Sequence, residues 1–228
     1  MIDIGIIGAM EVEVNDLVSR LENRKCETVS GIDFHTGKLL GKEVAIAKCG
    51  IGKVFAAMAA EVMILKYAPK LLVNTGVGGA LAHGLRCGDI VVAEKLCQHD
   101  MDTSPIGDPV GLVSGINRIW FETDESAREV LMKSGKELGL SVKLGSIATG
   151  DRFVATNDVK KYIVDTFGAK YSTLKSFLFN LFLIKLTLVI MFSINPSLGP
   201  LIIFSLSGSF ILLKYNCLIS TLKILFSL

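Results

Sequence analysis

Two acidic residues near the N-terminus are the side chains best placed for chemistry. Glu11 and Glu13 follow a short apolar run, residues 3–8, that ends in glycine. Apolar residues then recur at helical spacing over residues 11–23, which predicts a strand leading into a helix. Both carboxylates would lie in the first turn of that helix, at the rim where α/β proteins bind ligands. Taken alone, their place in the first turn favours the alternative that they complement the partial positive charge of the helix N-terminus.

Glycine clusters mark the ends of three apolar runs, at residues 50–52, 76–79 and 149–151. Ligands of open α/β sheets gather beyond the carboxyl ends of the strands, so these clusters outline a candidate site. The dinucleotide fingerprint GxGxxG is absent, because Leu81 stands at the third glycine position. A P-loop is also absent, since Val54 follows Lys53 where Ser or Thr would be needed. Tight turns are therefore favoured over phosphate cradles.

No metal site is predicted from the remaining polar motifs. The His-Asp-Met-Asp run at residues 99–102 places neighbouring side chains on opposite faces of an extended chain, so loop polarity explains it better. His35 and His83 stand alone. The five cysteines have neither zinc spacing nor a disulfide pattern, which favours a reducing cytosol. The first residues also lack the features of a secretory signal.

Alternating patterns predict an α/β domain. We expect strands at residues 3–8, 43–49, 71–75, 89–93 and 141–149, and helices at 11–23, 54–66, 123–138 and 157–167. Thr123 and Thr156 are the expected N-caps of the last two helices. The polar segment 98–117 is too long for a simple connector. It could cover a site, meet another subunit, or form an ordinary surface loop.

The bulk composition conceals a division near residue 169. The chain has 228 residues, of which 50% are hydrophobic and 20% charged, with a net charge of +2 and a mean hydropathy of +0.52. These values exclude a disordered chain and a nucleic-acid-coating polycation. Residues 1–169 hold 19 basic and all 22 acidic residues, whereas residues 170–228 hold five Lys and no acid.

Five segments in order resemble the signature segments of bacterial 5′-methylthioadenosine/S-adenosylhomocysteine nucleosidases, members of the purine nucleoside phosphorylase-like superfamily. They are GIIGAMEVEV at 5–14, CGIGKV at 49–54, NTGVGG at 74–79, GLRCGDIVV at 84–92 and TGDRFV at 149–154. The resemblance covers residues 1 to about 169. It implies a three-layer α/β sandwich with a mixed central sheet.

The resemblance also implies a reaction. Such enzymes cleave the N9–C1′ bond of adenine thionucleosides with water, in methionine salvage, without a metal or organic cofactor. Glu13 would activate the water, and the acidic turn around it argues against a phosphate nucleophile. Phe153 and Val154 would hold adenine by ring stacking and backbone hydrogen bonds. The ribose and water region would be lined by Ala9, Met10, Ile51, Val77, Gly78 and Gly79. The resemblance further implies a cytoplasmic homodimer that binds small molecules and no nucleic acid.

The resemblance ends where the composition changes. Related enzymes continue with a Met-Glu pair that grips the ribose and an Arg-x-Ile-Ser-Asp segment whose Asp protonates adenine. Neither is present here, and residues 170–228 contain no Asp or Glu to replace them. We therefore expect a C-terminal part that is missing or replaced, and a chain that is poorly stable and impaired or inactive.

Three interpretations of residues 170–228 compete. The apolar runs 177–194 and 198–213 could form a membrane hairpin, although Lys185 falls near the middle of the first. A buried core element is disfavoured by the lack of clean periodicity. The bias toward Leu, Ile, Phe and Ser favours a third interpretation, in which T-rich DNA is read out of frame. The alternative to an active hydrolase is thus a non-catalytic remnant, membrane-tethered or not, that binds adenine weakly. A nucleoside phosphorylase is a distant third.

Overall fold

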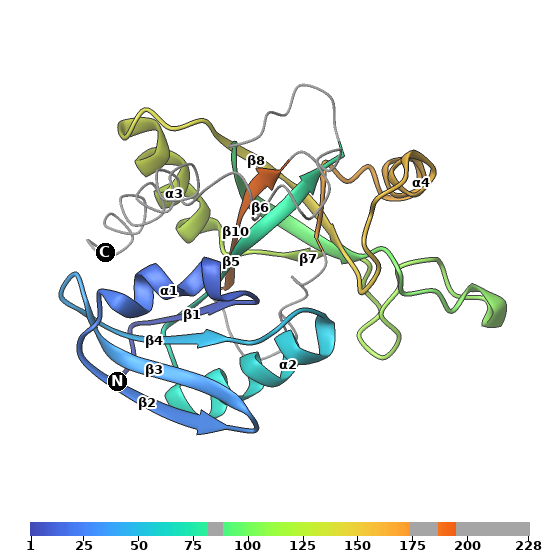
Figure 1. Cartoon of the computed structure of the whole chain (residues 1–228). Coiled ribbons are helices and arrows are strands. Elements are labelled where there is room, and N and C mark those ends of the chain that lie inside the picture. The colour runs from blue at the N-terminus through green and yellow to red at the C-terminus, as the bar shows by residue number, and fades with distance from the viewer. Residues whose placement is uncertain (82–88, 174–186, 195–228) are drawn as a thin grey trace.

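The protein is described here from a computed structural model, in which residues 1–81, 89–173 and 187–194 are placed (Figure 1). The helices are α1 (Glu11–Ser19), α2 (Lys53–Val62), α3 (Glu125–Glu137) and α4 (Asn157–Phe167), with a π-helical turn at Met63–Tyr67 and a 3₁₀ turn at Ser104–Ile106. The strands are β1 (Ile4–Gly8), β2 (Glu22–Val29), β3 (Ile32–Leu39), β4 (Lys42–Lys48), β5 (Leu71–Ala80), β6 (Ile90–Gln98), β7 (Phe121–Glu122), β8 (Val142–Thr149), β9 (Tyr171–Thr173) and β10 (Thr187–Ile194).

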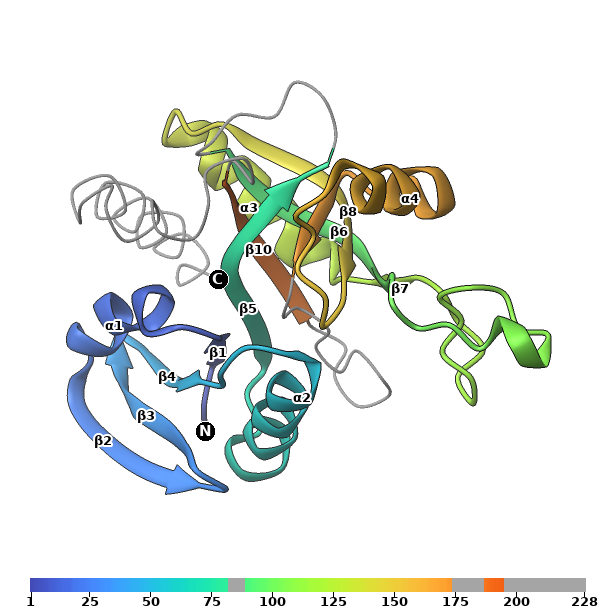
Figure 2. The same cartoon turned by 45° about the vertical axis from the view of Figure 1, so that its right-hand side comes forward.

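The ten strands of the described residues belong to one mixed sheet, which confirms the predicted α/β class. Strand β1 lies between β4 and β5 and is parallel to both. Strands β2, β3 and β4 form an antiparallel meander on one side. Strand β5 is long and curved, and it leads from this first half of the sheet into the second (Figure 2).

The second half of the sheet closes on itself. Strand β5 pairs with β10, β10 with β6, β6 with β8, β8 with β9, and β9 with the end of β5. Because β1 pairs with β5 only at residues 71–74, the same edge of β5 is available to β9 at Gly79 and Ala80. A single strand therefore joins an open sheet to a closed circuit of five strands.

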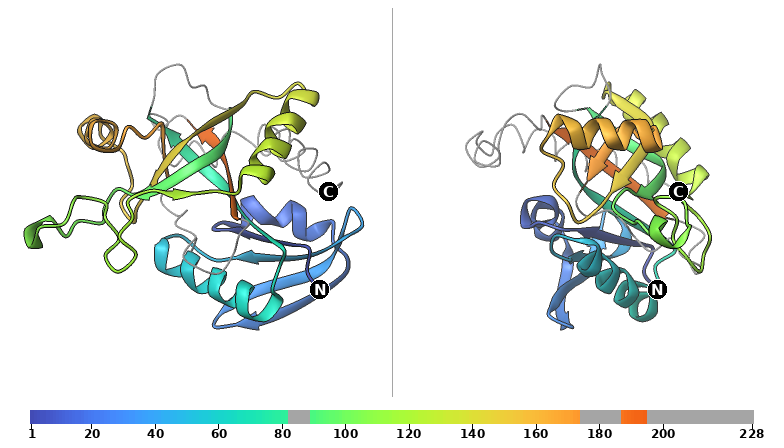
Figure 3. Two further views of the ribbon diagram at one scale, coloured as in Figure 1. Left: turned by 180° about the vertical axis from the view of Figure 1, so that it is seen from behind. Right: turned by 90° about the vertical axis from the view of Figure 1, so that its right-hand side faces the viewer.

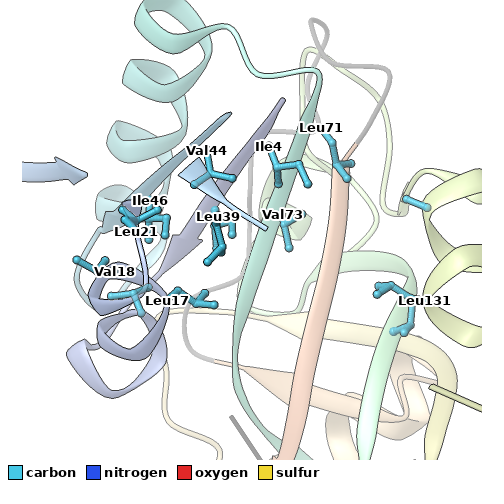
Figure 4. Close-up of a cluster of buried hydrophobic side chains, with 14 of the residues drawn as sticks. Ile4, Leu17, Val18, Leu21, Leu39, Val44, Ile46, Leu71, Val73 and Leu131 are labelled. Carbon is cyan, nitrogen blue, oxygen red and sulfur yellow. The ribbon is translucent and has the colours of Figure 1, made fainter. Parts of the chain in front are cut away.

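Helices cover the sheet on both faces, as a three-layer sandwich requires (Figure 3). One cluster joins Leu17 and Val18 of α1 and Leu131 of α3 to the strands (Figure 4). The opposite face packs against small residues of α2, among them Ala56 and Ala60. Side chains alternate across β1, so that Ile6 belongs to the first cluster and Ile7 to the second.

A third cluster lies between strands of the closed circuit. Tyr171 of β9 is 2% exposed and packs with Val91, Ala93, Leu96 and Ile147. Helix α4 packs elsewhere, with Ile163 against Cys97 and Ala148. The circuit thus has its own apolar filling, separate from the clusters under α1 and α2.

Several predicted boundaries are wrong, and each has a local cause. Helix α1 ends at Ser19 rather than at residue 23, because the chain enters β2 at Glu22. The hairpins linking β2, β3 and β4 were not predicted. Their turns are two-residue pairs, Ser30-Gly31 and Leu40-Gly41, with positive φ at every position. Such pairs suit the primed turns of hairpins, so the signal was present in the sequence.

The two predicted N-caps have different outcomes. Thr156 is confirmed, because its hydroxyl accepts from the backbone N–H of Val159. Thr123 is wrong: the cap of α3 is Asp124, whose carboxylate accepts from Ala127 N at 2.8 Å. The Thr123 hydroxyl instead donates to the carbonyl of Ala93 in β6 at 2.5 Å. A residue already bonded to the neighbouring strand leaves the capping position to the next side chain.

The sheet continues past the compositional break. Strand β9 begins at Tyr171, and β10 pairs with β5 along eight residues. Part of the proposed membrane run 177–194 is therefore strand β10, while the run 198–213 lies outside the described residues. Within the described ranges, no helix is long and apolar enough to cross a membrane.

Candidate active site

Glu13 is held in one position by three backbone N–H groups. Its Oε2 accepts from Ala9 N at 2.8 Å and from Met10 N at 3.0 Å. Its Oε1 accepts from Val77 N at 3.3 Å. The residue is 1% exposed, yet it lies in the first turn of α1, directly after β1. These three bonds fix the position of the carboxylate between β1, α1 and β5.

Glu11 differs from Glu13 although both were candidates. Its carboxylate is exposed and accepts from Lys48 Nζ at 2.8 Å, and this hydrogen bond lowers its pKa. Exposed pairs of this kind contribute little to stability. Of the two candidates, Glu13 is therefore the buried and fixed carboxylate, and Glu11 is a surface residue beside it.

The glycines around Val77 lie in a strand, so the tight turn predicted there is wrong. Strand β5 runs through Gly76, Val77, Gly78 and Gly79 to Ala80 instead of ending at residue 75. Gly79 pairs with Ser172 of β9, and a Cβ at position 79 would lie 3.4 Å from the Ser172 hydroxyl. Extended backbone with small side chains lets the Val77 N–H point at Glu13.

The segment after β4 does form a tight turn, as predicted. Gly50 has φ of +95° and Gly52 has φ of +110°, which side chains rarely tolerate. The turn is bonded to the end of β1 and the residue after it, because Cys49 N donates to Gly8 O at 2.8 Å and Gly50 N donates to Ala9 O at 3.2 Å. Ile51, predicted to line the ribose region, is 57% exposed at the tip of the turn.

The segment after β8 carries the two residues expected to hold adenine. Phe153 is 53% exposed, so its ring is open to a stacking partner. Val154 is 8% exposed, and its side chain packs with Cys97 and Ile163. Because a valine side chain has no polar atom, any hydrogen bond from Val154 to a base would come from its backbone.

Three polar residues at this rim were missed by the sequence analysis. Lys53, Asp100 and Asp151 are joined by hydrogen bonds between the segments that follow β4, β6 and β8. Asp100 had been assigned to loop polarity. The signal that could have found it is its place directly after a strand end, the same place that Asp151 occupies. Within the described part of the chain, no three His, Cys, Asp or Glu side chains are grouped to hold a metal ion.

The Met-Glu pair and the Arg-x-Ile-Ser-Asp segment expected from the resemblance have no counterpart among the described residues. The chain reads Tyr171-Ser172-Thr173 along β9, without a Met-Glu pair. Residues 174–186 and 195–228 lie outside the described residues. The described part of the candidate site is therefore built on β1, α1, β4 and β5, with the loop that carries Phe153.

The α/β fold is that of the phosphorylase superfamily, whose family model matches residues 3–172. A curated relative, the 5′-methylthioadenosine/S-adenosylhomocysteine nucleosidase of Shewanella loihica, is 38% identical over 166 residues, which are 72% of this chain and 71% of the relative. The chain belongs to the 5′-methylthioadenosine/S-adenosylhomocysteine nucleosidases, a family of N-glycosyl hydrolases.

Solved structures agree with this assignment. The Streptococcus pneumoniae nucleosidase of the same name, bound to the transition-state inhibitor MT-ImmA, is 33% identical with a TM-score of 0.83, over 98% of this chain and 100% of that one. A futalosine hydrolase mutant of Helicobacter pylori is 26% identical with a TM-score of 0.88, over the full length of both chains.

Proposed function

We propose that this chain hydrolyses the N-glycosidic bond of 5′-methylthioadenosine and S-adenosylhomocysteine, releasing adenine and a thioribose sugar. The observation that carries the proposal is the buried Glu13 carboxylate, fixed by Ala9, Met10 and Val77 at the rim of β1. Relatives that match most of this chain bear that activity in their names. The proposed reaction uses no metal or organic cofactor.

Glu13 acts as the base toward water. Three N–H donors fix the carboxylate before substrate arrives, so little reorganisation is needed when the water gives up its proton. As the C1′–N9 bond breaks, positive charge develops on the sugar, and a nearby carboxylate stabilises it. Val77, Gly78 and Gly79 offer backbone and small side chains beside Glu13, which leaves room for the ribose.

The leaving adenine is the weaker end of the site. Phe153 supplies an open ring for stacking, and the backbone of Val154 supplies hydrogen bonds. We infer that the acid that would protonate adenine is missing from the sequence. Loss of a general acid lowers the rate by about 10²–10⁴. The chain is therefore expected to be a slow enzyme that still depends on Glu13.

A matched pair of substitutions tests the proposal. Adenine release from methylthioadenosine should be abolished by Glu13→Gln, which keeps the shape and removes the charge. Glu11→Gln should change the rate less than about threefold, because Glu11 is exposed and bonded to Lys48. Equal loss in both variants would contradict the role of Glu13. No release by the unaltered chain, with adenine still bound, would favour the non-catalytic remnant.

Two other substrates separate the remaining alternatives. Futalosine should be tested, because a futalosine hydrolase has the same fold over the full chain. Faster release from futalosine than from methylthioadenosine would move the assignment to that nucleoside. Formation of a sugar phosphate only when phosphate is present would instead identify a phosphorylase.

A homodimer is part of the proposal. Helix α2 exposes a row of apolar side chains on one face, namely Val54 at 69%, Phe55 at 50% and Met58 at 38% exposed, next to Ile51 at 57%. Contiguous exposed apolar residues of this kind mark protein contacts. Phe55→Glu should convert a dimer into a monomer in light scattering after gel filtration, and a monomeric unaltered chain would contradict this point.

The proposal extends to the origin of residues 170–228. We infer that they are read out of frame, and DNA sequencing around codon 169 tests this. An intact Met-Glu and Ile-Ser-Asp coding stretch in another frame would support the inference, and its absence would refute it. The position of β10 in the sheet is compatible with an out-of-frame origin and with an in-frame one, because apolar, β-prone residues fit a sheet on propensity alone.

A further inference from the structure

Three segments distant in sequence meet at one polar ring beside the site. Lys53 Nζ donates to Asp100 Oδ1 at 2.6 Å, Asp151 N donates to Asp100 Oδ2 at 2.7 Å, and Lys53 N donates to Asp151 Oδ1 at 2.7 Å. Each of the three residues is thus bonded to the other two. Gln98 Oε1 also accepts from Lys53 Nζ, at 3.1 Å.

The ring is unlike an ordinary surface ion pair. Two of its three bonds use backbone N–H groups, so they fix the course of the chain and not only side chains. The Lys53 and Asp100 side chains are only 20% and 23% exposed. Burial by itself would raise the pKa of Asp100, but the bonds from Lys53 and from the Asp151 N–H outweigh it and lower that pKa. Partly buried, charge-assisted bonds in a closed network hold more firmly than isolated exposed pairs.

Glycines on both sides of the ring allow its close contacts. A Cβ at Gly150 would lie 2.6 Å from His99 Nε2 and 2.8 Å from Asp100 Cγ. Gly52, at φ of +110°, would place a Cβ 3.4 Å from Asp151 Oδ1. His99 lies buried beneath, tied to β8 by a bond from its N–H to Thr149 O at 2.9 Å. Glycine at positions 52 and 150 therefore leaves the space that these close contacts need.

The ring joins the two segments that the proposed function assigns to substrate. Ile51 lies two residues before Lys53, and Phe153 lies two residues after Asp151. Asp151 also accepts from the first residue of α2, so the Phe153 segment is attached to the start of that helix. The distance between the turn at residues 50–52 and the loop that carries Phe153 therefore depends on these bonds.

We propose that Lys53, Asp100 and Asp151 are positioning residues, which hold the Phe153 loop against the turn at residues 50–52 and thereby set the affinity for the nucleoside. This inference rests on the proposed function for its effect on substrate. None of the three acts on the reacting bond, so their removal should affect KM more than kcat.

The test uses the full chain with Asp100→Asn, Asp151→Ala and Lys53→Met, because Ala at position 151 removes the acceptor of the Lys53 N–H. We expect each variant to raise KM for methylthioadenosine about tenfold, equivalent to ~1.4 kcal/mol, with kcat within about twofold. Lys53→Arg should recover part of the affinity, because it restores a cation that can donate to Asp100. The matched control is Asp102→Asn on the same loop, since among the described contacts Asp102 bonds only to the backbone N–H and side chain of the nearby Ser104.

Hydrogen exchange provides a readout without substrate. Amides of residues 51–55 and 151–155 should exchange about tenfold faster in the three ring variants than in the unaltered chain, and should not change in Asp102→Asn. Unchanged exchange, or faster exchange with an unchanged KM, would overturn the proposal. If the unaltered chain releases no adenine, the proposed function fails, and exchange alone then decides whether the ring holds the two segments together.

Discussion

The carboxylate of Glu13 lies 3.3 Å from the backbone nitrogen of Val77, a residue 64 positions later in the chain. The same carboxylate takes the N–H groups of Ala9 and Met10. Its position therefore depends on β1, α1 and β5 together. A small change in any of these three elements should therefore displace the Glu13 carboxylate even where the fold is retained.

Gly8→Ala is expected to displace Glu13. A Cβ at position 8 would lie 2.7 Å from Val14 Cγ1 and 3.2 Å from Glu13 Cβ. Overpacking of this kind costs about 1–3 kcal/mol, and a base displaced by an ångström loses roughly 100-fold in rate. We expect a lower Tm together with a loss of kcat in the adenine-release assay.

Gly145→Ala is the control for that loss. It introduces a similar clash, 2.6 Å from the Tyr171 ring, in β8 rather than beside Glu13. It should lower Tm by a comparable amount and leave kcat of the folded fraction nearly intact. If both variants lose kcat equally, the effect of Gly8→Ala comes from general destabilisation.

The cap of α3 is expected to depend on Asp124. Asp124→Ala removes the acceptor of the Ala127 N–H and should reduce the free energy of unfolding by ~1 kcal/mol in urea titrations. Asp124→Asn retains an acceptor oxygen and should lose much less. Equal losses would show that charge at the helix N-terminus matters more than the cap bond.

Strand β10 is expected to support the second half of the sheet. A chain ending at residue 173 would leave one edge of β5 open along 72–79 and one edge of β6 open along 90–92. Open edges of this length promote aggregation. We expect this chain to be far less soluble and less protected in hydrogen exchange than one ending at residue 194, which retains β10. Equal protection of residues 72–79 in both would show that β10 contributes nothing.

Stability is expected to fall as the pH drops below 6.5. Burial lowers the pKa of His99 from its ordinary 6.5, with Lys53 and Arg152 adding to the decrease and Asp100 opposing it. Burial similarly lowers the pKa of His35. The unfolded chain therefore binds more protons than the folded one at mildly acidic pH. The contribution of the neutral histidines to the free energy of unfolding is fully present above pH 6.5 and decreases as the pH falls below that value.

Urea unfolding at pH 7.5, 6.5 and 5.5 measures this dependence. His99→Gln should flatten the slope, whatever it does to absolute stability, and His35 should account for the remainder. This window lies above the range in which the paired carboxylates such as Asp100 titrate, because their pKa values are lowered from 3.8. An unchanged slope in His99→Gln would exclude His99 as the source.

Local patterns were sufficient for much of the fold. Apolar spacing predicted β1, β4, β8 and helices α1, α3 and α4, because burial of one face imposes a period that is visible in a short window. Thr156 was found as a cap because the cap bond spans three residues. The carboxylates of the first turn were also visible, and the resemblance selected Glu13 between them.

Contacts between distant segments required the tertiary structure. The sequence could not show that β5 continues through its glycines, since the pairing that extends it comes from β9 and β10. It could not separate Glu13 from Glu11 on physical grounds, because burial and the Val77 N–H distinguish them.

The sequence by itself therefore determined the α/β class and the family and located the carboxylate that we propose as the base, all of which rest on residues close together in the chain. Only the tertiary structure decided how the base is held and how the rim is joined. The bond from Lys53 N to Asp151 spans 98 positions and the bond from Lys53 Nζ to Asp100 spans 47. No local periodicity encodes such pairs, because they form only when the strands that precede them have been placed in one sheet.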